Sequence, residues 1–144
     1  MKKVVIAEDN ALNRELLREL LEIRGYAVIE ACNGVEALEQ IAKTNPDILL
    51  LDLSMPVLDG FGTIERIREN PSFSTLPVLA VTAYAMEGDR EKVMASGFDG
   101  YLSKPIDAVA LQNELERLEQ RKPTKAAPRL APKAFKRCNE VKLH

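Results

Sequence analysis

The sequence predicts an α/β protein built from five strand–helix units, with one parallel sheet covered by helices on both faces. Two observations support this class. Short apolar runs alternate with helical patterns throughout residues 2–121, which is the pattern of βαβ units. The runs of the first, third and fourth predicted strands are continuous rather than alternating, as expected for strands buried on both faces.

The first unit begins with a strand at residues 3–8. Asn10 is a typical residue for the start of a helix, and Gly25 is typical of the position where a helix ends. Residues 26–31 form the second predicted strand, which is shorter and more mixed in composition. The helix between these strands has one wide apolar face, formed by Leu12, Leu16, Leu17, Leu20, Leu21 and Ile23.

The second helix follows Asn33, and Pro46 ends its connection to the third strand at residues 48–51. A loop then leads to the third helix at residues 62–70, which is closed by Pro71. Helical spacing in the second helix is shown by Val35, Leu38 and Ile41.

The last two units are shorter. The fourth strand is predicted at residues 76–82, and the core of the fourth helix lies at residues 86–97. A short fifth strand is predicted at residues 100–103. A fifth helix follows, whose apolar side consists of Val109, Leu111, Leu115 and Leu118.

Length and composition indicate one globular domain. The chain has 144 residues, of which 46% are hydrophobic and 29% charged, and this balance is typical of water-soluble proteins. No apolar run approaches the roughly 20 residues that a membrane-spanning helix needs. The first apolar run ends at Glu8, short of the roughly 7 residues that a signal peptide requires. We therefore expect a cytoplasmic location.

The cysteines and the histidine exclude several kinds of chemistry. Cys32 and Cys138 are far apart in unlike surroundings, so they predict neither a disulfide framework nor a metal site. The single histidine, His144, follows the predicted domain and is not placed to act as a buried, oriented base. Catalysis that depends on histidine is therefore not expected.

The residues after Arg121 differ from the rest in charge. Residues 122–144 contain seven Lys or Arg and one Glu, a formal charge of +6, whereas residues 1–121 contain 13 basic and 21 acidic residues. Three prolines and no sustained apolar period make residues 122–144 a predicted disordered tail behind a domain at residues 1–121. The tail could bind an acidic partner, membrane lipids or nucleic acid, or only aid solubility. It is too short for a DNA-binding domain.

Polar residues follow four of the five predicted strands. The first strand ends in Glu8 and Asp9, the third in Asp52 and the fourth in Thr82, and Lys104 follows the fifth. In an open parallel sheet, ligands bind in a crevice outside the carboxyl ends of the strands. We therefore expect these five side chains to converge at one edge of the sheet.

Three neighbouring carboxylates repel one another unless protons or a cation offset their charge. Oxygen ligands of this kind suit Mg2+, which keeps several waters and favours one or two carboxylates together with phosphate oxygens. Asp52 could then attack phosphorus as a nucleophile, while the metal, Lys104 and Thr82 stabilise the phosphoryl oxygens.

With these residues in place, residues 2–121 resemble the receiver domain of two-component response regulators, of the single-domain chemotaxis-regulator type. Four segments carry the resemblance in order and spacing: AEDN at 7–10, DLSMPVLDG at 52–60, VTAYA at 81–85 and YLSKPI at 101–106. The four together are highly specific, although each alone would be weak. The resemblance implies a flavodoxin-like fold with strand order 2-1-3-4-5.

The resemblance also implies roles for the site residues. Asp52 would be the phosphoacceptor, and its phosphorylation and dephosphorylation would be self-catalysed, so that the protein is a switch rather than a turnover enzyme. Asp9 would bind Mg2+ directly and Glu8 would help through water, while the backbone carbonyl of Ser54 would complete the protein ligands. Lys104 would pair with the phosphoryl group and with Asp52.

Several neighbouring residues would control the switch. Thr82 would hydrogen-bond the phosphoryl group, Ala83 would leave room beside it, and Tyr101 would turn inward on activation, unless Tyr101 is only a packing aromatic. The Lys104–Pro105 peptide bond is expected to be cis. The side chains of Ser54 and Tyr84 would tune how fast water reaches the acyl phosphate.

The partners implied are a sensor histidine kinase or a histidine phosphotransfer protein as donor. An unidentified protein would bind the surface formed by the fourth helix, fifth strand and fifth helix. A homodimer is a further option.

Other functional classes fit the sequence less well. A phosphatase of the haloacid-dehalogenase type needs a second Asp two residues after the nucleophile, where this chain has Ser54. Nucleotide-binding glycine motifs are absent. The remaining alternative is an interaction module on the same fold that works without phosphorylation.

The loop after Asp52 also contains residues to which we assign a structural role rather than a chemical one: Met55, Pro56, Asp59 and Gly60.

Overall fold

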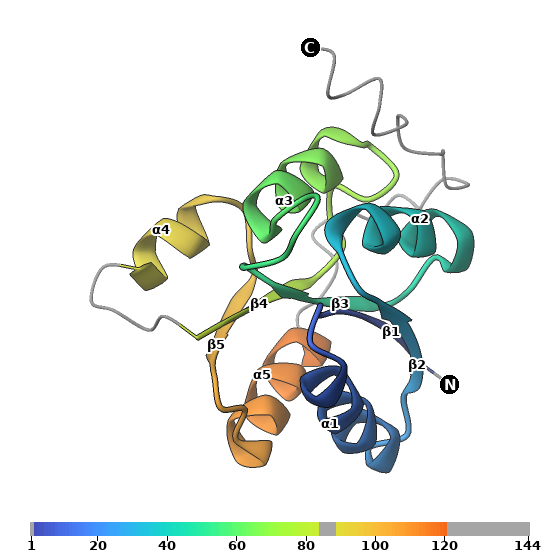
Figure 1. The fold of residues 1–144 in the computed structure, drawn as a ribbon, viewed down its shortest axis with the longest axis vertical. Coiled ribbons are helices and arrows are strands. Elements are labelled where there is room, and N and C mark those ends of the chain that lie inside the picture. The colour runs from blue at the N-terminus through green and yellow to red at the C-terminus, as the bar shows by residue number, and fades with distance from the viewer. Residues whose placement is uncertain (1, 84–88, 121–144) are drawn as a thin grey trace.

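The computed structural model describes residues 2–83 and 89–120, in which strands and helices alternate from end to end (Figure 1). The five predicted strand–helix units are confirmed. In chain order the elements are β1 (Lys3–Ala7), α1 (Ala11–Ile23), β2 (Ala27–Ala31), α2 (Gly34–Thr44), β3 (Ile48–Asp52), α3 (Gly60–Glu69), β4 (Val78–Thr82), α4 (Asp89–Ala95), β5 (Gly100–Ser103) and α5 (Ala108–Gln120).

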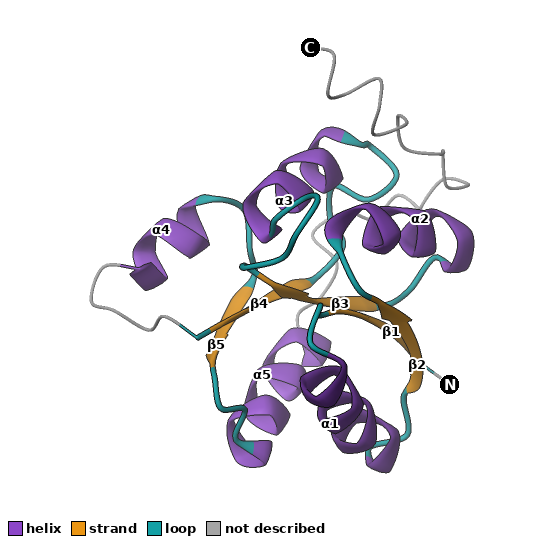
Figure 2. Ribbon diagram, viewed as in Figure 1, coloured by secondary structure: helices purple, strands orange, loops and turns teal. Residues whose placement is uncertain are grey.

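The strands form one parallel sheet in the order β2-β1-β3-β4-β5, which confirms the predicted fold class and strand order. Helices α1 and α5 cover one face of the sheet, and α2, α3 and α4 lie on the other (Figure 2). The chain order therefore reverses direction across the sheet between β1 and β3. This switch point is where an open α/β sheet leaves a crevice.

The side chains of each strand alternate between two buried layers. Val4 and Ile6 of β1 pack in the core beneath α1 and α5, whereas Val5 and Ala7 pack in the core beneath α2 and α3. Successive residues of a strand point to opposite faces of the sheet, so burying both faces requires a continuous apolar run. Strands β3 and β4 are buried at every position for the same reason.

The wide apolar face predicted for the first helix is only partly buried. Leu17 and Leu21 are in the core, and Leu20 packs against its margin. A straight helix contacts the sheet along one side only, so residues on the opposite side cannot reach it. Four residues of the predicted apolar faces are instead exposed: Leu12 (75%), Leu16 (48%), Ile23 (80%) and, on α5, Val109 (64%).

Side-chain caps set the starts of three helices. Asn10 accepts a hydrogen bond from the backbone N of Asn13 at 3.0 Å, and Asn33 caps α2 in the same way. Asp59 caps α3, which therefore begins at Gly60, two residues before the predicted start. Helix α4 ends at Ala95, two residues earlier than predicted, and its predicted start at residue 86 lies outside the described residues.

The loop between β3 and α3 contains a strained turn. The backbone N of Leu58 donates to the carbonyl oxygen of Pro56 at 2.7 Å, which closes a three-residue turn around Val57. Val57 has a φ of 70°, in the left-handed region that β-branched residues rarely adopt. Its side chain is 62% exposed, so little packing offsets the strain.

Replacing Val57 with Gly should therefore stabilise the protein. Strain of about 1–3 kcal/mol is relieved, against an entropic cost of about 0.5–1 kcal/mol for the glycine, so we expect a net gain of about 1 kcal/mol in the free energy of unfolding. Urea denaturation measures this change. Val109 is similarly exposed, at 64%, on a helix without a positive φ, so Val109→Gly should lower the stability. If Val57→Gly instead lowered the stability, the backbone at Val57 would not be strained.

Candidate functional site

The five polar residues predicted to converge lie together at the carboxyl edge of the sheet. Carboxylate oxygens of Glu8, Asp9 and Asp52 all lie within 4.8 Å of one another. The ammonium group of Lys104 contacts two of these carboxylates, and Thr82 ends the strand beside Asp52. Residues more than 90 positions apart in the chain thus form one cluster, because parallel strands end at the same edge.

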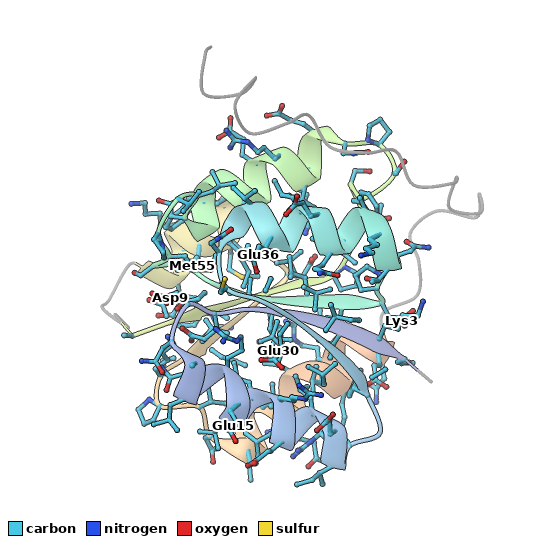
Figure 3. The ribbon with its side chains drawn as sticks, turned by 45° about the vertical axis from the view of Figure 1, so that its right-hand side comes forward. Lys3, Asp9, Glu15, Glu30, Glu36 and Met55 are labelled. Atoms are coloured by element: carbon cyan, nitrogen blue, oxygen red, sulfur yellow. The ribbon has the colours of Figure 1, made fainter. Side chains whose placement is uncertain are left out.

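Figure 3 shows the position of this edge. Asp9 and Met55 are labelled at the end of the sheet that holds the cluster, whereas Lys3, at the start of β1, lies at the opposite end. Met55 is buried in the core beneath α2 and α3, so the loop after Asp52 is anchored by an apolar side chain.

Asp52 is the last residue of β3, and the strand holds it at the edge of the core with 3% of its surface exposed. Its Oδ1 accepts a hydrogen bond from the backbone N of Ser54 at 3.1 Å. Its Oδ2 accepts from Nζ of Lys104 at 3.0 Å. Each oxygen therefore has one donor, which fixes the plane of the carboxylate and still leaves lone pairs for another ligand.

Glu8 is more deeply buried than its neighbours, with 1% of its surface exposed. Its Oε2 accepts from the backbone N of Asn10 at 3.1 Å, and its Oε1 lies 2.7 Å from Nζ of Lys104. Burial raises the pKa of Glu8 to about 7, with Asp52 adding to the rise and the Lys104 hydrogen bond opposing it.

Lys104 connects the carboxylates through both its backbone and its side chain. Its backbone N donates to the carbonyl oxygen of Thr82 at 2.7 Å, and the peptide bond to Pro105 is cis. Burial acts to lower the pKa of Lys104, but its contacts with Glu8 and Asp52 outweigh burial and raise that pKa. The side chain therefore stays cationic at neutral pH.

The three carboxylates fit a divalent cation. Glu8 and Asp52 are buried, Asp9 is exposed, and Lys104 supplies only one positive charge to the group. The raised pKa of Glu8 indicates that the site disfavours its full negative charge when no metal is bound. Oxygen-only ligands with an open, solvent-facing side are the kind of site that Mg2+ occupies.

The other residues singled out in the sequence lie around this cluster. Thr82 is 4% exposed at the end of β4, while Ala83 and Ser54 are exposed. Tyr101 is half-buried and packs against the core beneath α2 and α3. Tyr84 lies outside the described residues.

Two contacts at the site were not predicted from the sequence. Arg14 on α1 donates from Nη1 to the carbonyl oxygen of Glu8 at 2.8 Å and from Nε to Glu30 at 3.0 Å, and so holds the end of β1. A Cβ on Gly60 would lie 2.8 Å from the carbonyl oxygen of Asp52, too close for any side chain. An arginine in a helix carries no local signal of such a contact, whereas a glycine near a functional carboxylate is a usable hint.

Comparison with known proteins agrees with this geometry. Residues 4–116 match the family model described as "Response regulator receiver domain". The chain belongs to the response regulator receiver family. Its resemblance to that family, first inferred from four short segments, is thereby confirmed. Proteins of this family act as signalling switches in two-component systems rather than as turnover enzymes.

The similar curated proteins are also response regulators. This receiver is 41% identical over 105 residues to the polar-differentiation response regulator DivK of Brucella anthropi, a match that covers 73% of this chain and 85% of that protein. The DivK protein of Brucella ovis is 40% identical over the same length and coverage.

Solved receiver structures have the same fold. A putative response regulator from Chloroflexus aurantiacus aligns with a TM-score of 0.79 at 32% identity, covering 83% of this chain and 98% of that one. The receiver domain of a sensor histidine kinase from Pseudomonas aeruginosa has a magnesium ion in its active-site cleft. It aligns with a TM-score of 0.75 at 32% identity, covering 81% of this chain and 96% of that one. The chemotaxis protein CheY4 of Vibrio cholerae aligns with a TM-score of 0.76 at 30% identity, covering 82% of this chain and 98% of that one.

None of the helices within the described residues is both long and apolar enough to cross a membrane.

The raised pKa of Glu8 predicts a pH dependence of stability in Mg2+-free buffer. The folded-state pKa of Glu8, about 7, lies above its ordinary value of 4.5. The Glu8 carboxyl therefore stabilises the folded state at pH values below 4.5, and this stabilisation is lost as the pH rises through about 7. We expect the free energy of unfolding to fall by about 1–3 kcal/mol between about pH 5 and about pH 8. Glu8→Gln should remove this fall.

Urea denaturation in the presence of EDTA, repeated across this pH range, measures the effect. Glu65 is exposed on α3, and Glu65→Gln is the matched control that should leave the fall in place. A fall that persists unchanged in Glu8→Gln would show that another group is responsible.

Proposed function

We propose that this receiver accepts a phosphoryl group on Asp52 from a sensor histidine kinase or a histidine phosphotransfer protein and then switches its contacts with other proteins. The observation that carries the proposal is the position of Lys104, whose Nζ lies 2.7 Å from Glu8 and 3.0 Å from Asp52. A buried, oriented carboxylate beside a lysine and two further carboxylates suits nucleophilic attack on phosphorus assisted by a divalent metal.

In the proposed reaction, one oxygen of Asp52 attacks the phosphorus atom of the donor. A new bond forms between that oxygen and phosphorus, the bond from phosphorus to the donor imidazole nitrogen breaks, and its electron pair stays on the nitrogen. Lys104 is placed to neutralise charge on the phosphoryl oxygens, and the hydroxyl of Thr82 would donate to one of them. Attack by water on the acyl phosphate would later release inorganic phosphate, so both steps belong to the receiver.

Mg2+ is the proposed cofactor. Asp9, Asp52 and the backbone carbonyl of Ser54 would hold the ion, and Glu8 would act through a water molecule. When bound, Mg2+ supplies positive charge that offsets the carboxylates and the incoming phosphoryl group. The magnesium ion in the related Pseudomonas aeruginosa receiver supports this choice.

The output of the switch is proposed to involve Thr82 and Tyr101. Drawing Thr82 toward the phosphoryl group would leave space that Tyr101 can fill, with Ala83 small enough to permit the change. This would bias the surface formed by α4, β5 and α5, where a downstream protein would bind. The side chains of Ser54 and Tyr84 would set how fast water reaches the acyl phosphate, and Tyr84→Ala should speed dephosphorylation if shielding is its role.

Residues 1–121 form the proposed functional domain, and residues 122–144 form a separate basic tail. The alternative is an interaction module on this fold that works without phosphorylation. It is disfavoured because an inert module has no need for Lys104 to be placed against two buried carboxylates.

Acetyl phosphate and Mg2+ should phosphorylate the full chain at Asp52, as measured by intact mass and peptide mapping. Asp52→Asn or EDTA should abolish the modification, and Lys104→Met should slow it by about 100-fold or more, because an electrostatic stabiliser is removed. Glu65 is exposed on α3, and Glu65→Gln should leave the rate unchanged. A parent chain that takes up neither a phosphoryl group nor beryllofluoride would overturn the proposal and favour the phosphorylation-independent module.

A further inference from the structure

Helix α1 carries a strip of apolar side chains on the side that faces away from the sheet. Leu12, Leu16 and Ile23 are 75%, 48% and 80% exposed, and they account for half of the large exposed apolar residues in the described part of the chain. At 100° per residue they fall within about 40° of one another around the helix axis, and about 100–180° from the buried Leu17 and Leu21. We call these three residues the α1 strip. Apolar residues gathered in this way mark a binding surface.

Acidic residues line one edge of the α1 strip. Glu15 and Glu19 are exposed, and neither forms an ion pair within the described residues. Figure 3 shows Glu15 on the side of α1 turned away from the sheet. The arginines of this helix and of its C-cap do not offset these charges, because they bind other groups: Arg14 and Arg18 bind Glu30, and Arg24 binds the carbonyl oxygen of Ala108 on α5. The surface thus suits an occupant that is both apolar and basic.

The last residues of α5 lie near the C-terminal end of this helix. Near the end of α5, Glu119 accepts a hydrogen bond from the hydroxyl of Tyr26, which follows Ile23 by three residues, and it also pairs with Lys2 at 3.1 Å. Gln120, the last described residue, is therefore close to the end of α1. The 24 residues that follow could span about 80 Å when extended, whereas α1 is only about 20 Å long.

We propose that residues 122–144 bind in cis along the α1 strip. The segment has a formal charge of +6 and places apolar residues next to basic ones, with Leu130 after Arg129 and Phe135 before Lys136. Its apolar side chains would cover the strip while the basic groups face Glu15 and Glu19. Attachment at Gln120 gives an effective concentration on the order of millimolar, so a weak contact suffices. The proposal does not depend on phosphorylation of Asp52.

The test compares the full chain with a chain that ends at Arg121, using two-dimensional amide NMR spectra. Truncation should shift the signals of residues 12–23 more than those of α2 or α3. Adding a synthetic peptide of residues 122–144 to the truncated chain should restore them. Raising the salt concentration about tenfold should weaken peptide binding several-fold, because exposed charge pairs are screened.

Variants on the strip separate this contact from a general charge effect. Leu12→Ser with Ile23→Ser should weaken peptide binding at least tenfold, and both side chains are so exposed that the core is not disturbed. Glu15→Gln with Glu19→Gln should weaken it several-fold. Val57→Ser changes a side chain that is 62% exposed in the β3–α3 loop, and Glu65→Gln changes an exposed carboxylate on α3, so both controls should bind like the parent.

Three results would overturn the proposal. Truncation could leave the signals of α1 unchanged. The shifts could instead map to another surface. Alternatively, sedimentation could show a dimer of the truncated chain that dissociates in Leu12→Ser with Ile23→Ser, and then the occupant of the α1 strip would be a second copy.

Discussion

The ion pairs that Lys104 makes with Glu8 and Asp52 are the constraint on which the arrangement of this receiver depends. They join the ends of β1 and β3 to the residue that follows β5, across the width of the sheet. Burying a lone carboxylate is costly, and two buried side by side are worse, so each needs the shared cation. The same placement fixes and partly neutralises Asp52, the proposed nucleophile, so the stability of the site and its proposed chemistry have one origin.

The backbone around Asp52 is shaped to serve this cluster. Gly60 lets the start of α3 approach the carbonyl oxygen of Asp52, and Val57 adopts a positive φ so that the chain can turn away within a few residues. Strain of this kind persists where the surrounding structure determines it, and it gathers at functional sites. Local preference is therefore overruled in the loop that follows the proposed phosphoacceptor, whereas the helices begin at side chains that favour capping.

The surface of α1, away from the cluster, exposes apolar side chains to solvent. Leu12, Leu16 and Ile23 follow the helical period of a buried face but lie in solvent, while α1 already packs through Leu17 and Leu21. Exposed apolar groups do not stabilise an isolated domain, so their arrangement is explained by an occupant rather than by folding. The opposite charges of the domain and the tail make a segment of the same chain a sufficient occupant.

The sequence by itself determined the fold class, the strand order through the family resemblance, two of the helix caps and the five residues of the cluster. These follow from local periodicity, from capping chemistry and from the rule that parallel strands end at one edge. Only the tertiary structure decided which side of α1 is exposed, that Arg14 holds the end of β1, and that the pKa of Glu8 is raised. Each of these depends on distances between residues far apart in the chain, and periodicity along the sequence carries no such information.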